Sequence, residues 1–111
     1  MTISEMVSAL NLTLFAGENG LNREIQGGYC ADLLSDVMGH AKSGQVWITL
    51  QTHKNVLAIA SLKDLSAIIH VKGLQPDPGT IEHANLENIP VLGTTEEAFE
   101  TCGKLFRLLN K

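Results

Sequence analysis

Short apolar runs alternate with amphipathic segments along this chain, and each run is followed by a polar or glycine-rich turn. The clearest run is Val46-Trp47-Ile48-Thr49-Leu50, which stops abruptly at a polar cluster. A continuous apolar run of this kind is typical of a strand that is covered on both faces, as in a parallel sheet. The pattern predicts strands over residues 12–16, 46–50, 67–71 and 89–92, and another that begins within 23–26 and ends at Tyr29-Cys30.

Apolar positions at helical spacing separate these strands. They predict helices over residues 4–11, 32–38, 56–62, 80–88 and 95–109. Residues with short polar side chains suit the N-caps, and the candidates are Ser4 or Thr2, Asp32 or Ser35, Thr80, and Thr95. The apolar face of the last helix is expected to comprise Ala98, Phe99, Cys102, Leu105, Phe106 and Leu109.

Strands that alternate with helices form βαβ units with right-handed crossovers. We therefore expect an α/β fold, a three-layer sandwich in which helices cover both faces of a mostly parallel sheet. At 111 residues the chain is expected to form a single domain, residues 1–111. Trp47, in the middle of a strand, is expected in the core.

The charge and composition of the chain narrow the classes of binding partner that are expected. The net charge is −4 and the eight basic residues are scattered, so a nucleic-acid partner held through its phosphates is not expected. No apolar run approaches the ~20 residues that span a bilayer, and the first residues do not resemble a signal peptide. Cys30 and Cys102 match no metal-binding spacing, which favours two reduced thiols in a cytoplasmic protein with no membrane partner.

A ligand site is expected at the carboxyl ends of the parallel strands, where α/β sheets bind ligands. Helix N-termini converge there, and their free N–H groups suit a small anion such as a phosphate. The candidate binding residues follow four predicted strands: Gly27, Gly28, Tyr29 and Asp32 after the first, Gln51, Thr52, His53 and Asn55 after the second, Gly73 after the third, and Gly93 and Thr94 after the fourth.

Each candidate also has a purely structural interpretation. Gly27-Gly28 suits a tight turn, Asp32 and Thr94 suit helix caps, and His53 suits a surface or capping position. Asp32 and Asp36, four residues apart, suit either an acid–base pair or two solvated carboxylates. No spacing links His40, His70 and His83 as metal ligands, so no metal site is expected. The sequence leaves any cofactor unidentified.

Familiar catalytic motifs are missing. The sequence has no G-x-x-x-x-G-K-[ST] phosphate-binding loop, no G-x-G-x-x-G after a strand and no G-x-S-x-G nucleophile elbow. An enzyme of this size needs a nucleophile or base with an orienting group. His53 is the one residue that could be nominated as a general base, and no carboxylate partner for it is evident in the sequence.

The order of elements, together with the segments Gly27 to Met38, Val46 to Ala60 and Ile68 to Pro76, resembles the DRTGG domain family, whose fold is like that of the N-terminal domain of HPr kinase. The resemblance covers residues 4 to 109. In place of the family's Asp-Arg pair this chain has Thr52-His53, and in place of Thr-Gly-Gly it has Val71-Lys72-Gly73. The chain is similar to small stand-alone members that lack the kinase P-loop domain.

The resemblance implies a regulatory or oligomerising module, since the kinase activity of HPr kinase resides in the P-loop domain. Three hypotheses follow. The first is a non-catalytic regulatory or ligand-binding domain, a homodimer with an anionic or nucleotide ligand at the strand carboxyl ends. The second is a structural partner-binding module whose helices at 56–62 and 98–109 form an interface. The third is a small enzyme that uses His53 as general base.

Overall fold

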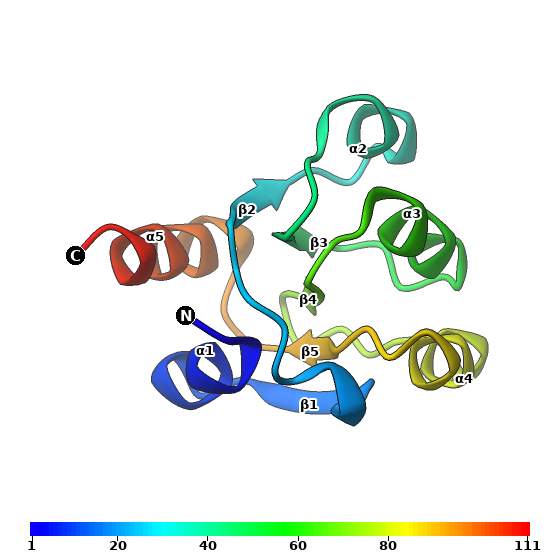
Figure 1. The fold of residues 1–111 in the computed structure, drawn as a ribbon, viewed down its shortest axis with the longest axis horizontal. Helices are drawn as coiled ribbons and strands as arrows, with labels where there is room; N and C mark the ends of the chain where they lie inside the picture. Colours follow the sequence, from blue (N-terminus) through cyan, green and yellow to red (C-terminus); the bar gives the residue numbers. More distant parts are fainter.

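Five strands form one sheet in the order β1-β5-β4-β3-β2 in the computed structural model, which describes residues 1–111 (Figure 1). The strands are β1 (Thr13–Ala16), β2 (Gly27–Cys30), β3 (Gln45–Thr49), β4 (Ala67–His70) and β5 (Val91–Gly93). Strands β2 to β5 are mutually parallel, and β1 joins β5 in the antiparallel sense. The predicted α/β fold with a mostly parallel sheet is confirmed.

Helices cover both faces of the sheet unequally. Helices α2 (Leu34–His40), α3 (Asn55–Lys63) and α4 (Pro78–Glu87) lie on one face, and α1 (Ile3–Leu10) and α5 (Ala98–Leu109) lie on the other (Figure 1). The strands β2, β3, β4 and β5 neighbour one another in chain order, so their right-handed crossovers all fall on the same face. The sheet therefore has no point where the strand order reverses, which is where α/β sheets commonly open a ligand crevice.

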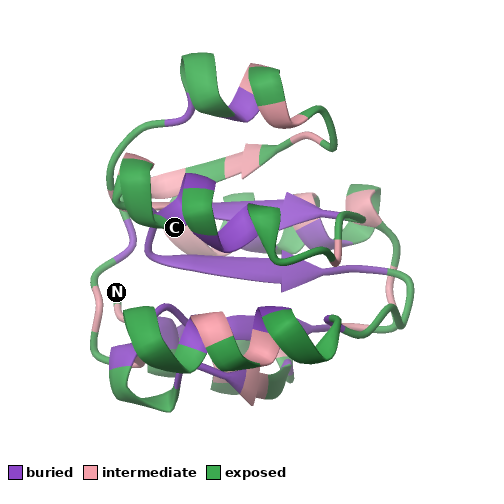
Figure 2. Cartoon of the chain, turned by 90° about the vertical axis from the view of Figure 1, so that its right-hand side faces the viewer, coloured by how far each residue is buried: buried purple, intermediate pink, exposed green.

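Two cores sandwich the sheet because neighbouring residues of a strand point to opposite faces. Trp47 lies in the core under α2, α3 and α4, and the adjacent Ile48 lies in the core under α1 and α5. Both are buried, as the sequence predicted for Trp47, and the Trp47 indole N–H donates to the carbonyl of Ala31 at 2.8 Å. Figure 2 shows the buried central strands beside a partly exposed β2.

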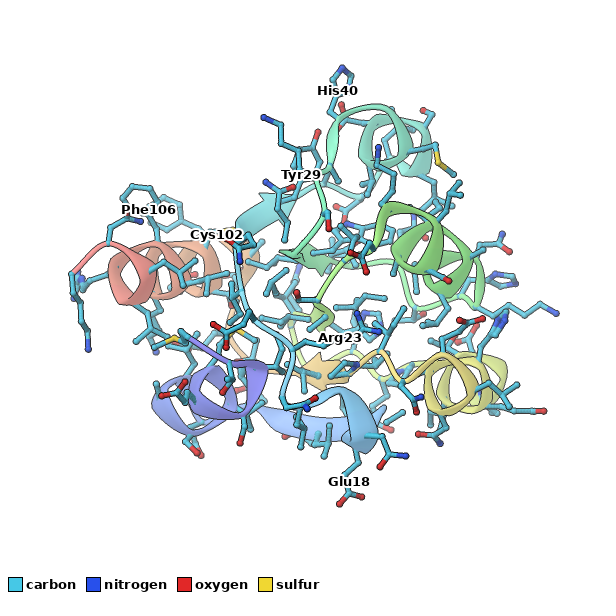
Figure 3. The ribbon with its side chains drawn as sticks, in the orientation of Figure 1. Glu18, Arg23, Tyr29, His40, Cys102 and Phe106 are labelled. Carbon is cyan, nitrogen blue, oxygen red and sulfur yellow. The ribbon has the colours of Figure 1, made fainter.

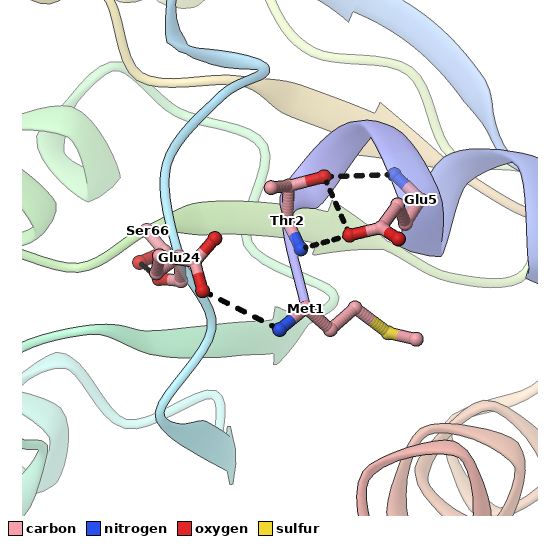
Figure 4. Close-up of polar contacts among 5 residues, drawn as sticks. All are labelled: Met1, Thr2, Glu5, Glu24 and Ser66. Atoms are coloured by element: carbon pink, nitrogen blue, oxygen red, sulfur yellow. Dashed lines mark hydrogen bonds and ion pairs between the residues drawn. The ribbon is translucent and has the colours of Figure 1, made fainter.

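The first helix begins at a capping box. The Thr2 hydroxyl accepts a hydrogen bond from the Glu5 N–H at 3.2 Å, and the Glu5 carboxylate accepts from the Thr2 N–H at 2.9 Å (Figure 4). The Thr2 N–H, and after it the Thr2 hydroxyl, donate to the Glu5 carboxylate and lower the pKa of Glu5, because they favour its charged form. The cap is thus Thr2 rather than Ser4. The Met1 ammonium pairs with Glu24, whose carbonyl accepts from the Ser66 hydroxyl at 2.6 Å.

Residues 23–26, predicted to begin a strand, do not. Glu24 forms only an isolated bridge with Thr2, and the strand begins at Gly27. The alternation of polar and apolar residues here comes from Ile25, which is buried under α1 while its neighbours stay accessible. Gly27 and Gly28 therefore belong to β2 itself and do not form a loop after it, which corrects their predicted position.

Three helices begin at residues other than the predicted caps. Helix α4 starts at Pro78 with Asp77 as N-cap, before the predicted Thr80, because proline suits the first helical position and its fixed φ starts the turn early. Helix α5 has Glu97 rather than Thr95 as N-cap. Helix α2 has Leu33 as N-cap, so Asp32 and Ser35 do not cap it.

The predicted apolar face of α5 is only partly buried. Leu105 is buried and Cys102 and Leu109 are half-buried, but Phe99 is 85% exposed and Phe106 is 70% exposed. Figure 3 shows Phe106 above α5, on the side of the helix away from α1. Helix α5 packs over β2 at the end of the sheet, where no further helix lies beyond it to cover its outer side.

Candidate functional site

The carboxyl edge of the parallel strands brings together eight of the eleven predicted site residues. They lie in or directly after the ends of β2, β3, β4 and β5, and they are Asp32, Gln51, Thr52, His53, Asn55, Gly73, Gly93 and Thr94. Gly27, Gly28 and Tyr29 lie elsewhere, in β2, because the strand begins at the glycines.

Asp32 organises the end of β3. Its carboxylate accepts hydrogen bonds from the Thr49 hydroxyl at 2.9 Å and from the Leu50 N–H at 2.7 Å. Its carbonyl accepts from the side-chain amide of Gln51 at 3.0 Å. The side chains of Asp32 and Gln51 thus hold the β3–α3 loop against the end of β2, which is a structural role.

Thr52 ties the β3–α3 loop to α4. Its carbonyl accepts hydrogen bonds from the Asp77 N–H at 3.1 Å and from the Thr80 hydroxyl at 2.7 Å. The hydroxyl of Thr80 is fully buried, so this contact satisfies a polar group that water does not reach. The starts of α3 and α4 are thereby held side by side.

The ring of His53 lies at the start of α3, just before its N-cap Lys54. Its Nδ1 accepts a hydrogen bond from the Asn55 N–H at 3.2 Å. Because Nδ1 is the acceptor, the neutral ring carries its proton on Nε2 and presents that N–H to solvent. In this tautomer the exposed nitrogen is a donor, which suits an anion, and it is not a free base. No carboxylate pairs with His53, since the ion pairs of the chain involve other residues.

A shallow hollow of about 330 Å³ lies between α3 and α4. Lys54, Asn55 and Gly79 line it at the helix starts, and His83 and Glu82 line it farther along α4. Lys54 supplies a positive charge, and its aliphatic stem packs over Gly79. A Cβ on Gly79 would lie 3.7 Å from the Cδ of Lys54. The first-turn N–H of Gly79 has no acceptor within its helix. The hollow can thus offer several donors to an anion.

The ends of β4 and β5 are shaped by packing and turns. A Cβ on Gly93 would lie 2.3 Å from the Phe15 ring, so glycine is required there by β1. The Thr94 hydroxyl accepts from the Glu96 N–H at 3.2 Å, and its N–H donates to the His70 carbonyl. Gly73 has φ 71° in a turn whose Cβ position is open. Packing and turn formation therefore account for the residue types at Gly93 and Thr94. Gly73, by contrast, leaves open space above its turn.

His70, at the end of β4, is fully buried and neither ring nitrogen has a hydrogen-bond partner. Burial lowers the pKa of His70 below its usual 6.5, although the nearby Thr49 carbonyl and Asp77 carboxylate favour the charged ring. The Thr49 carbonyl lies close without meeting the geometry of a hydrogen bond, and it already accepts from the Val71 N–H. A neutral imidazole thus lies under the carboxyl edge.

Tyr29 has a structural role. Its hydroxyl donates to the Asp36 carboxylate at 2.6 Å and so ties β2 to α2. This bond raises the pKa of Tyr29, because the neutral phenol is the form that donates to the carboxylate. Asp36 also pairs with His40, and Asp32 lies outside the helix, so the two aspartates do not form an acid–base pair.

A larger hollow lies elsewhere, between β2 and α5. This groove, of about 630 Å³, is lined by Gly27, Gly28, Tyr29, Cys30, Gln45, Ile48, Phe99, Cys102, Gly103, Leu105, Phe106, Leu109 and Asn110. Burial, with the neighbouring Cys30 thiol, raises the pKa of Cys102 to about 11. Sequence reasoning placed Phe99 and Phe106 on the apolar face of the last helix, but it did not predict the groove. Their spacing of seven residues, on a different side from Leu105, was the available signal.

Other classes of site find little support in the structure. No group of three or more histidine, cysteine, aspartate or glutamate side chains is placed to hold a metal ion. None of the helices has the length and apolar character that crossing a bilayer requires.

Comparisons with known proteins bear on the fold. No protein-family model matches the chain, and no curated protein matches it. Among solved structures it is similar to the regulatory region, with CBS and DRTGG domains, of a pyrophosphatase from Clostridium perfringens, solved with its activator diadenosine tetraphosphate. The TM-score is 0.69 at 17% identity, and the match covers 94% of this chain and 45% of that one. The likeness supports a DRTGG-like α/β fold for this chain.

Proposed function

We propose that this chain is a non-catalytic regulatory domain that binds a small anionic ligand, such as a nucleotide, at the carboxyl edge of its sheet and works as a homodimer. The observation that carries the ligand site is the set of donors around the hollow between α3 and α4. Lys54 supplies a positive charge there, and His53, the preceding residue in the chain, carries an exposed Nε2–H donor at the start of α3. The start of α4 adds the Gly79 N–H and the positive end of the helix dipole.

The fold and its likeness support a regulatory role. The solved relative is described as a regulatory region bound to a nucleotide activator, and this chain shares that region's fold over most of its own length. The carboxyl edge offers donors and a cation but no paired nucleophile and base. A reversible binding function fits these groups better than catalysis does.

A thermal-shift screen of purified protein tests the site, using nucleotides and inorganic phosphate as probes. A ligand at a hundred times its Kd stabilises the fold by about 2.7 kcal/mol, on the order of 10 °C in Tm for a domain of this size. We expect Lys54→Gln to abolish the shift and His53→Ala to weaken it. Lys42→Gln, an equally exposed lysine at the amino end of β3, serves as the matched control.

The ligand site is wrong if no probe shifts the Tm, or if Lys54→Gln and Lys42→Gln respond to the ligand alike. An activity screen addresses the enzyme alternative. Because the Nδ1 of His53 is engaged as an acceptor, we expect no hydrolysis or phosphoryl transfer that depends on this ring. Activity that disappears in His53→Gln would contradict the non-catalytic proposal.

A further inference from the structure

We propose that two copies of this chain associate around a two-fold axis through the outer edge of β2 and the neighbouring face of α5, each copy placing Phe99 and Phe106 over the groove of the other. This inference rests on the homodimer in the proposed function and adds the surface that forms it. It is independent of the anion site, which lies between α3 and α4 on the opposite face of the sheet.

The two edge strands of the sheet, β1 and β2, differ in how well they suit pairing with a strand of another chain. β1 pairs with β5 through an irregular register with a shift between Leu14 and Ala16, and such bulges discourage further pairing. β2 pairs with β3 in an unbroken register over all four residues. β2 contains no proline or charged residue, the usual devices that protect an edge.

The outer side of β2 presents backbone groups to solvent. The Ala31 N–H donates to the Ile48 carbonyl of β3 at 3.3 Å, so the backbone groups of Ala31 and Tyr29 point toward β3. By alternation, those of Gly28 and Cys30 point outward. If β2 pairs with the β2 of a second copy around a two-fold axis, the two strands are antiparallel. This pairing would give the outward backbone groups of both chains hydrogen-bond partners.

The groove beside this edge excludes charged partners by its chemistry. None of its thirteen lining residues is charged, although the chain carries 20 Asp, Glu, Lys and Arg residues in total. An acidic or basic partner would find no counter-charge there, and its own charge would lose water without compensation. A second copy of the same surface brings no charge to the groove, so it needs no counter-charge and buries no charged group.

The shape of the surface is complementary to itself. Phe99 and Phe106 stand one heptad apart on α5 at the rim of the groove, and β2 forms the opposite wall. When antiparallel pairing brings two β2 edges together, each α5 approaches the other copy on the same face of the joined sheet. The phenyl rings of one copy then cover the groove of the other, an isologous arrangement.

The two exposed phenylalanines supply part of the area that a dimer of modest affinity needs. Phe99 and Phe106, at 85% and 70% exposed, offer together about 300 Å² per copy on the ~200 Å² scale of an aromatic side chain. A standard interface takes roughly 800 Å² from each partner. The groove walls and the β2 backbone must supply the remainder, so we expect a dissociation constant in the micromolar range.

Sedimentation equilibrium over roughly 1–500 μM protein tests this surface. We expect the wild-type chain to shift from monomer to dimer, and Phe106→Glu or Phe99→Glu to weaken association at least ~30-fold, as loss of an interfacial anchor of about 2 kcal/mol would. Leu62→Glu and Leu86→Glu are matched controls, because these leucines are 70% and 73% exposed on α3 and α4. The fluorescence of Trp47, the single and fully buried tryptophan, reports that each variant is folded.

Cys30 provides a second readout. Its thiol is exposed on β2 in the single chain and would be covered in the dimer. Alkylation of Cys30 by iodoacetamide, followed by mass spectrometry, should therefore slow as the protein concentration rises. The same rate should not depend on concentration in Phe106→Glu. Cys102 should react slowly throughout, since its raised pKa keeps the thiol protonated.

The outcomes separate the surface from the homodimer and from the ligand site. If the wild type dimerises and both phenylalanine variants dimerise as well, the surface is wrong and the homodimer stands. If the wild type stays monomeric at every concentration, both the surface and the homodimer are wrong. Neither result bears on the Lys54-dependent thermal shift, which tests the ligand site separately.

Discussion

The carboxyl edge of the sheet and the β2–α5 groove are two accessible regions with opposite construction. At the carboxyl edge, polar side chains are mostly engaged with the chain's own backbone, as Asp32 and Thr52 show. In the groove, apolar side chains surround a hollow that the chain does not fill, and Phe99 and Phe106 project at its rim.

The difference teaches how each region can be used. A tightly hydrogen-bonded edge holds its shape, so a small ligand can bind there with little reordering of the protein, which favours preorganised recognition. An unfilled apolar groove leaves surface in contact with water, and association removes that surface. The same contrast predicts that substitutions at the carboxyl edge cost more stability than equivalent substitutions in the groove.

The largest expected effect is that of Gly93→Ala at the end of β5. The new methyl group would lie 2.3 Å from the ring of Phe15, a half-buried residue of β1 that packs against the core. Overpacking of this kind costs about 3 kcal/mol in the free energy of unfolding. Urea denaturation followed by Trp47 fluorescence measures it. Gly39→Ala, where nothing lies within 4 Å, is the control and should not destabilise.

Asp32→Ala should come next, with a loss of about 2 kcal/mol. The substitution removes the acceptor of both the Thr49 hydroxyl, which is buried, and the Leu50 N–H. Asp32→Asn keeps one carbonyl oxygen in place and should lose less. Equal losses in the two variants, measured by urea denaturation, would show that these hydrogen bonds do not hold the loop.

A pH-dependent loss of stability is expected from His70. Because burial lowers its pKa below 6.5, the folded protein binds fewer protons at acidic pH than the unfolded chain does. The contribution is complete above about pH 6.5 and is lost as the pH falls through the folded-state pKa. Unfolding free energies between pH 5 and 7 should therefore fall more steeply in the wild type than in His70→Gln, and parallel curves would contradict this.

The smallest effect is expected for Gly28→Ala in the groove. The new methyl group would lie 3.0 Å from the Cδ2 of Leu105, which is the far end of a flexible side chain and can turn aside. The small strain is offset by the lower conformational entropy of alanine in the unfolded chain, so the change should lie within about 0.5 kcal/mol. A loss as large as that of Gly93→Ala would show that the groove is as rigid as the carboxyl edge.

Local sequence patterns predicted most of the fold. The continuous apolar runs at Val46–Leu50 and Ala67–Val71 identified the buried strands, because a parallel strand covered on both faces needs apolar residues at consecutive positions. Helix starts were predicted less well. Asp77, Glu97 and Leu33 take the N-cap positions, since the path of each loop, rather than the nearest threonine or serine, decides where a helix begins.

The candidate site was predicted in part. The pattern of strands and turns placed His53, Asn55 and Gly73 at the carboxyl edge of the sheet, where the structure has them, but sequence could not reveal that the His53 ring accepts the Asn55 N–H and so presents its other nitrogen as a donor. Gly79, which also lines the hollow, was not among the candidates, because only the fold brings the start of α4 beside Lys54 and Asn55.

Periodicity along the chain was enough to determine the order of elements and the existence of two helical layers, because both follow from which residues must leave water. Tertiary structure alone decided that β2 is an edge strand and that α5 lies over it with Phe99 and Phe106 exposed. An amphipathic pattern states which side of a helix is apolar, but it does not state how much of that side its neighbours will cover. That depends on strand order, which is set by contacts between residues far apart in the chain.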